Sequence, residues 1–118
     1  MTRPAAWIDV TARDAPASRA FYAGLFGWRI DVVEELDYGL VRADAPLAGG
    51  IGQAADANPH PPGVVTYVPV DDVPATVARA LDAGGALLVE PWEQPGMGVM
   101  AVIGDLDGNR VGVWAPPS

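Results

Sequence analysis

The chain has 118 residues, no cysteine, one histidine (His60) and a formal net charge of -8. This length fits a single domain, and the lack of cysteine excludes disulfide scaffolds, thiolate zinc sites and cysteine nucleophiles. A single histidine excludes a metal site with two histidines from one chain, and the negative charge disfavours nucleic acid and anionic membranes as partners. Because no apolar segment reaches the roughly 20 residues of a membrane span, we expect a cytoplasmic protein.

The first half of the chain predicts a strand, a helix and three further strands. Residues 6–12 alternate between apolar and polar side chains, which is typical of a half-buried strand. Asp14 followed by Pro16 predicts the start of a helix, and Gly27 predicts its end. The helix carries an apolar stripe, formed by Phe21, Leu25 and Phe26. The strands that follow are expected at about 28–35, 38–43 and 48–53.

The second half repeats the first at an offset of 58 residues. At this offset, six positions of the first helix and its flanks match: Asp14, Pro16, Ala17, Ser18, Ala20 and Gly27 fall on Asp72, Pro74, Ala75, Thr76, Ala78 and Gly85. The repeat predicts a strand at 64–70, a helix that ends at Gly84 and Gly85, and strands at 86–91, 97–104 and 110–115, with Asp107-Gly108 as a hairpin turn. We therefore predict an α+β fold of two βαβββ modules, at about 4–54 and 64–116, joined by a linker at 55–63.

Four segments carry a family resemblance. They are 21–28 (FYAGLFGW), 67–73 (YVPVDDV), 95–98 (PGMG) and 107–114 (DGNRVGVW). Together they resemble the glyoxalase, bleomycin-resistance and dioxygenase superfamily, also called the vicinal oxygen chelate superfamily. The resemblance implies strands that curl into a cup of mixed sheet, a ligand held in the cup, and a homodimer.

Active members of that superfamily often chelate a divalent metal with one ligand on the first and one on the last strand of each module. The resemblance puts the first-strand ligand positions at Trp7 and Val65. It puts the last-strand positions at Gly112 and near 52–54, a range without a carboxylate. These side chains offer no oxygen, nitrogen or sulfur ligand suited to such a metal. We therefore expect no metal and no cofactor, and no glyoxalase or ring-cleaving dioxygenase reaction.

Strand parity selects the side chains that would face a ligand. Alternate residues of the first, fifth and eighth strands share the face turned away from the helices. Segment 95–98 is either a flexible lid or an ordinary turn, with apolar contacts beside it. The predicted ligand-binding residues are Trp7, Asp9, Val65, Tyr67, Trp92, Met97, Arg110 and Trp114. In the alternative reading, Trp7 and Trp114 only fill the core or a dimer interface.

Asp9 interrupts an apolar strand and needs a partner if it is buried, for which Arg110 is expected. Asp9 and Tyr67 together would make an acid–base pair. His60 is expected to be a solvated residue of the linker. Two functions follow: a metal-independent protein that binds a small aromatic molecule, of the resistance or sequestration type, or a metal-independent isomerase, cyclase or lyase that uses Asp9 and Tyr67.

Overall fold

The computed structural model describes residues 7–42, 48–56 and 58–117. Both modules have the predicted order of one strand, one helix and three strands, which confirms the α+β class. The first module contains β1 (Trp7–Ala12), α1 (Ala15–Phe26), β2 (Arg29–Val33), a single 3-10 turn η1 (Glu34–Leu36), β3 (Tyr38–Arg42) and β4 (Ala48–Gln53). The second contains β5 (Gly63–Pro69), α2 (Val73–Asp82), β6 (Ala86–Gln94), β7 (Gly98–Gly104) and β8 (Arg110–Ala115). The chain divides into two compact units, with the boundary between Val65 and Thr66.

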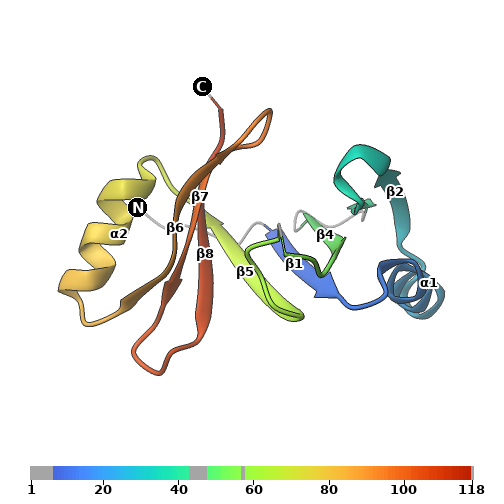
Figure 1. Ribbon diagram of the computed structural model, residues 1–118, viewed down its shortest axis with the longest axis horizontal. Coiled ribbons are helices and arrows are strands. Elements are labelled where there is room, and N and C mark those ends of the chain that lie inside the picture. Colours follow the sequence, from blue (N-terminus) through green and yellow to red (C-terminus); the bar gives the residue numbers. More distant parts are fainter. Residues whose placement is uncertain (1–6, 43–47, 57, 118) are drawn as a thin grey trace. The chain divides into compact units, whose positions relative to one another are not determined.

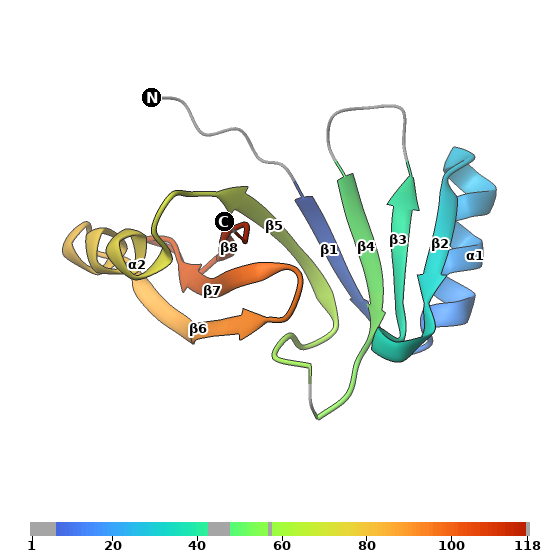
Figure 2. The same cartoon turned by 90° about the horizontal axis from the view of Figure 1, so that it is seen from above.

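The strands of the first module lie in the order β2-β3-β4-β1. β1 runs parallel to β4, whereas β3 is antiparallel to both β2 and β4, so the module has a mixed sheet. Asp9 of β1 is the register partner of Gly50 of β4. Figure 2 shows these four strands side by side, with α1 running along β2.

The second module repeats this arrangement in the order β5-β8-β7-β6. β5 and β8 are parallel, and β7 is antiparallel to both β6 and β8. Tyr67 of β5 is the register partner of Gly112 of β8, which corresponds to the pair of Asp9 and Gly50 in the first module. Figure 1 shows α2 beside the strands of this module.

The repeated helix starts are built as the sequence predicts. The Asp14 carboxylate accepts a hydrogen bond from the Ala17 N–H at 3.1 Å, and Asp72 accepts one from Ala75 at 3.0 Å. Each aspartate therefore satisfies one of the N–H groups that a helix start leaves without an intrahelical partner. Gly27 ends α1 with φ of 69°, a left-handed conformation that favours glycine.

The core of the second module lies between α2 and its sheet. Val73 and Val77 of α2 pack with Ala101 of β7 and Val113 of β8, and all four are buried. This cluster confirms the predicted parity of β8, since Val113 faces the helix and its neighbours Gly112 and Trp114 therefore face the other side of the sheet.

The apolar stripe of α1 is not part of such a core. Phe21, Leu25 and Phe26 are 61%, 60% and 58% exposed, and the buried residue of the helix is Ala15. At about 100° per residue, Phe21 and Leu25 fall on the flank of the helix and not on the face of Ala15. In the described part of the chain, no helix is long and apolar enough to cross a membrane.

Candidate functional site

A buried hydrogen-bond network centres on Asp9 in the first module. Asp9 carries the one buried carboxylate among the residues that the structure describes, with 8% of the residue exposed. The Tyr38 hydroxyl donates to Asp9 Oδ1 at 2.6 Å, and Trp7 Nε1 donates to the Tyr38 hydroxyl at 3.1 Å. His60 Nε2 lies 3.6 Å from Asp9 Oδ2. Both oxygens of the carboxylate are therefore engaged.

The strands explain how these side chains meet. Trp7 and Asp9 lie two residues apart on β1 and so point to the same face of the sheet. On β4, Gly50 leaves a space that the Tyr38 ring fills, and a Cβ at Gly50 would overlap the ring. A Cβ at Gly52 would lie 2.9 Å from Tyr38 Cδ1, which is also too close. The two glycines thus give the ring its place beside Asp9.

His60 is the clearest correction to the sequence analysis. The expectation of a solvated loop residue is wrong, because His60 is only 8% exposed. Asn58 holds the segment in place: its Oδ1 accepts from the His60 N–H at 2.9 Å, and its Nδ2 donates to the Gln53 carbonyl at 3.1 Å. The composition of the segment predicted a surface loop. A buried carboxylate such as that of Asp9 is unfavourable without a partner, and His60 supplies one.

Burial raises the pKa of the Asp9 carboxyl, because a low-dielectric surrounding disfavours its charged form. The hydrogen bond from Tyr38 and the charge of His60 act in the opposite direction and lower the pKa, but by less. A carboxyl group held in this way can take up and release a proton nearer to neutral pH than an exposed aspartate can.

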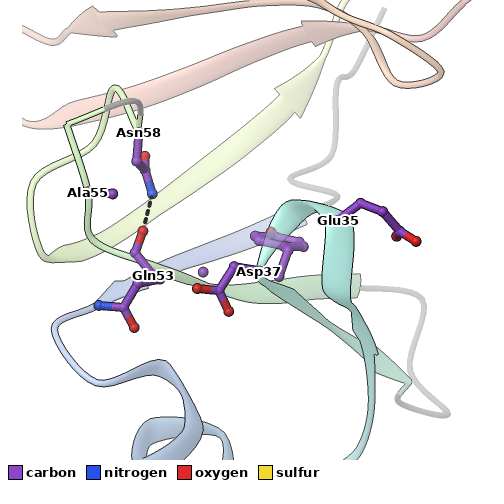
Figure 3. Close-up of a pocket in the computed structure, with 7 residues that line it drawn as sticks. Glu35, Asp37, Gln53, Ala55 and Asn58 are labelled. Atoms are coloured by element: carbon purple, nitrogen blue, oxygen red, sulfur yellow. Dashed lines mark hydrogen bonds between the residues drawn. The ribbon is translucent and has the colours of Figure 1, made fainter.

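A cavity of about 320 Å³ lies beside this network in the first module. Its lining, drawn in Figure 3, consists of Glu35, Asp37, Tyr38, Gly52, Gln53, Ala55 and Asn58. The amide of Gln53 is already bonded to the backbone of residues 13 and 15, and that of Asn58 to residues 53 and 60. None of these lining residues was predicted from the sequence to line a cavity, and composition alone gave no signal for it.

The second module presents a row of predicted ligand-binding residues on the sheet face opposite α2. Arg110 and Trp114 lie on one face of β8, on either side of Gly112. Tyr67 is next to Gly112, and it is buried with its ring over the glycine, where a Cβ would overlap it. Trp114 pairs with Met100, and Met100 pairs with Trp92.

The segment 95–98 forms a tight turn in the structure. The Met97 N–H donates to the Gln94 carbonyl at 2.9 Å, and Gly96 has φ of 79°. Trp114 Nε1 donates to the Met97 carbonyl at 2.6 Å, and this bond ties the turn to β8.

The side chains at the family's metal positions do not fit a divalent metal. Trp7 directs its only polar group to Tyr38, Val65 has no polar group, and Gly112 lies under the Tyr67 ring. Among the residues that the structure describes, there is no group of three His, Cys, Asp or Glu side chains that could share an ion. The salt bridge between Asp9 and Arg110 stays a prediction, whereas Tyr38 and His60 are the partners seen at Asp9.

Comparisons with known proteins agree with this fold. Residues 5–113 match the model of the Glyoxalase/Bleomycin resistance protein/Dioxygenase superfamily. The chain is 34% identical to the anthracycline biosynthesis protein DnrV of Streptomyces peucetius, over 92% of this chain and 46% of that protein. It is also 34% identical to the putative glyoxylase CFP32 of Mycobacterium tuberculosis, over 92% of this chain and 44% of that protein.

The chain therefore spans less than half the length of these curated relatives. Among solved structures, methylmalonyl-CoA epimerase from Mycobacterium tuberculosis superposes with a TM-score of 0.68 at 14% identity, over 97% of this chain and 88% of that chain. The family match, the duplicated βαβββ order and the repeated helix starts lead to one assignment. The chain belongs to the Glyoxalase/Bleomycin resistance protein/Dioxygenase superfamily.

Proposed function

We propose that this chain is a metal-independent protein that binds a small aromatic molecule, of the resistance or sequestration type. The observation that carries the proposal is the pair of Tyr67 and Gly112, in which an aromatic ring occupies the space of a last-strand ligand position. A carboxylate at that position could not coexist with the ring as it lies. An aromatic ring thus stands where the family resemblance places a metal-binding side chain.

The row of aromatic residues on the second module supports an aromatic ligand. Trp92, Met100 and Trp114 are neighbours across three strands and are all partly exposed. A flat ligand stacked on them gains apolar burial and offset-stacking energy, the latter about 1 kcal/mol for each ring pair. Because Trp114 Nε1 is bonded to Met97, the indole is held in one orientation and is ready to stack.

The names of two relatives agree with this ligand class. DnrV and DauV are both called anthracycline biosynthesis proteins. Anthracyclines are flat polycyclic aromatic compounds, and such a ring system matches the aromatic row in chemistry. We therefore choose a flat anthraquinone as the probe for the experiment below.

The test is the affinity of anthraquinone-2-carboxamide, measured by calorimetry on the wild type and on Trp114→Ala. We expect the substitution to raise the dissociation constant about tenfold or more, which corresponds to roughly 1.4 kcal/mol. Trp28→Ala is the matched control, because Trp28 stacks on Tyr22 in the first module and not in the aromatic row. Equal affinity of the wild type and Trp114→Ala, or no binding at all, would reject the proposal.

A second candidate function is supported by the Asp9 network. A buried carboxyl with a raised pKa, bonded at 2.6 Å to a phenol, can serve as a general acid–base group in an isomerase, cyclase or lyase. Tyr38 takes the place that the sequence analysis gave to Tyr67. Conversion of the probe by the wild type but not by Asp9→Asn, followed by mass spectrometry, would favour this enzyme over the binding protein.

We also propose a homodimer. Phe21, Leu25 and Phe26 form an exposed apolar surface on α1, and contact between such a surface and water is unfavourable in free energy. A second copy of the chain carries the same apolar surface, so two copies can bury these surfaces against each other. Such isologous pairing is the commonest closed arrangement of identical subunits.

A further inference from the structure

The Arg110 guanidinium is an unusual group in the second module. Its Nη1 is buried, and it has no hydrogen-bond partner among the residues that the structure describes. Leaving a charged donor buried without an acceptor is costly, and native proteins rarely do so without a reason. A ligand that brings an acceptor oxygen would remove this cost on binding.

The Asp105 carboxylate, in the turn that precedes Arg110, is bonded within that turn. Asp105 accepts from the N–H groups of Asp107 and Asn109 at 2.9 and 2.8 Å, and from Asn109 Nδ2 at 2.9 Å. These bonds hold the turn between β7 and β8, and they lower the pKa of the Asp105 carboxyl. Asp105 therefore stabilises its own turn, and the guanidinium stays available in a chain with 15 acidic and only 7 basic residues.

Arg110 lies on the same face of β8 as Trp114, toward the opposite end of the strand. It is the first residue of β8 and pairs with Gly104, beside which the Leu88 side chain lies. At a rise of about 3.4 Å per residue, the Cα atoms of Arg110 and Trp114 are about 14 Å apart. Between them, the buried Tyr67 ring fills the space over Gly112, so this face has a cation at one end and an indole at the other.

We propose that the ligand is an aromatic acid, whose carboxylate pairs with Arg110 while its ring system stacks toward Trp114. This inference rests on the proposed function and names the class of ligand. A carboxylate fits because the planar guanidinium donates two parallel hydrogen bonds to its two oxygens. A neutral aromatic compound would offer Nη1 of Arg110 at most an uncharged acceptor, which forms a weaker hydrogen bond than a carboxylate does.

The experiment compares two probes that differ only in charge, anthraquinone-2-carboxylate and its neutral carboxamide. Calorimetry at one pH and salt concentration gives both affinities on the wild type, Arg110→Gln and the control Arg79→Gln. Arg79 is in the same module, in the last turn of α2, and it is exposed. It therefore reports the effect of losing one positive charge away from the aromatic row.

We expect the wild type to bind the carboxylate about tenfold or more tightly than the carboxamide, as is typical of a hydrogen bond to a charged group. Arg110→Gln removes this preference and leaves the carboxamide affinity unchanged, and Arg79→Gln keeps the preference. If Arg110→Gln does not fold, judged by near-ultraviolet circular dichroism, Arg110→Lys and the two wild-type affinities decide.

Equal wild-type affinities for the two probes would overturn the inference, as would a preference that survives in Arg110→Gln. If both probes bind equally and Trp114→Ala weakens both, the aromatic site stands and only the acid is wrong. If neither probe binds, the proposed function fails together with the inference.

Discussion

Gly112, which lies under the Tyr67 ring, leads to a test in which the same substitution has opposite effects at two positions. Gly112 and Gly24 both lack a side chain, but their surroundings differ. A Cβ at Gly112 would overlap the buried ring of Tyr67, whereas a Cβ at Gly24, in the middle of α1, would meet nothing within 4 Å. Substituting alanine at each position thus separates the steric effect from the intrinsic effect of removing a glycine.

The magnitudes follow from these surroundings. Alanine at a helical or strand position is favoured over glycine by roughly 0.5–1 kcal/mol, because glycine loses more conformational entropy on folding. Forcing an extra group into a packed core costs about 1–3 kcal/mol. Gly24→Ala should therefore raise the free energy of unfolding by about 0.5–1 kcal/mol, and Gly112→Ala should lower it by about 1–2 kcal/mol.

The assay is thermal unfolding followed by circular dichroism. For a chain of this size, 1 kcal/mol corresponds to a change in Tm of about 4 °C. We expect Gly112→Ala to lower Tm by about 4–8 °C and Gly24→Ala to raise it by about 2–4 °C. A second comparison isolates the ring: in a Tyr67→Leu background, alanine at position 112 should cost clearly less than it does in the wild type. An unchanged or higher Tm of Gly112→Ala would refute the packing of Tyr67 over Gly112.

Three further predictions concern Asp9, the dimer and the metal. The raised pKa of Asp9 means that its contribution to stability is complete below its unfolded value of 3.8 and is lost as pH rises through the folded value. Asp9→Asn should therefore be more stable than the wild type at pH 7, with a gap that closes toward pH 4 in thermal melts; a gap that widens on acidification would contradict this. Sedimentation equilibrium at micromolar concentration should give a dimer, and Leu25→Glu in the exposed α1 face should give a monomer, whereas a monomeric wild type would reject the homodimer. Addition of Mn²⁺ or Zn²⁺ should leave Tm unchanged, and a saturable increase would show a metal site in spite of Trp7, Val65 and Gly112.

Local signals in the sequence were sufficient for the fold. The aspartates before each helix and Gly27 after the first act within a few residues of themselves, so their structures could be predicted from short segments. The internal repeat supplied the order of the elements in the second module. The single turn η1 was missed, because Glu34 and Glu35 carry no apolar periodicity.

The candidate site depends on contacts between distant segments, and there the sequence was less informative. The isolated position of Asp9 in an apolar strand did indicate a buried carboxylate in need of a partner. The identity of the partners depends on residues 29 and 51 positions away, Tyr38 and His60. The glycines at 50 and 52 were the available signal for Tyr38, since two small residues on one face of a strand leave room for a large ring.

Because His60 is anchored, the two ends of the segment between the modules differ in how they are held: the part up to His60 is bonded, and the part after it is exposed. Asn58 bonds to the Gln53 carbonyl and to the His60 N–H, and the His60 side chain lies against the Asp9 carboxylate. Pro61, Pro62 and Gly63 are exposed, and Gly63 has a positive φ of 148°, a conformation that residues with a side chain rarely adopt. Insertion of extra residues between 58 and 60 would pull the imidazole from its carboxylate, whereas insertion after Pro62 leaves that anchor intact. A peptide tag or a spliced-in domain therefore belongs on the carboxyl side of His60, and natural length variation among relatives is expected at the same place.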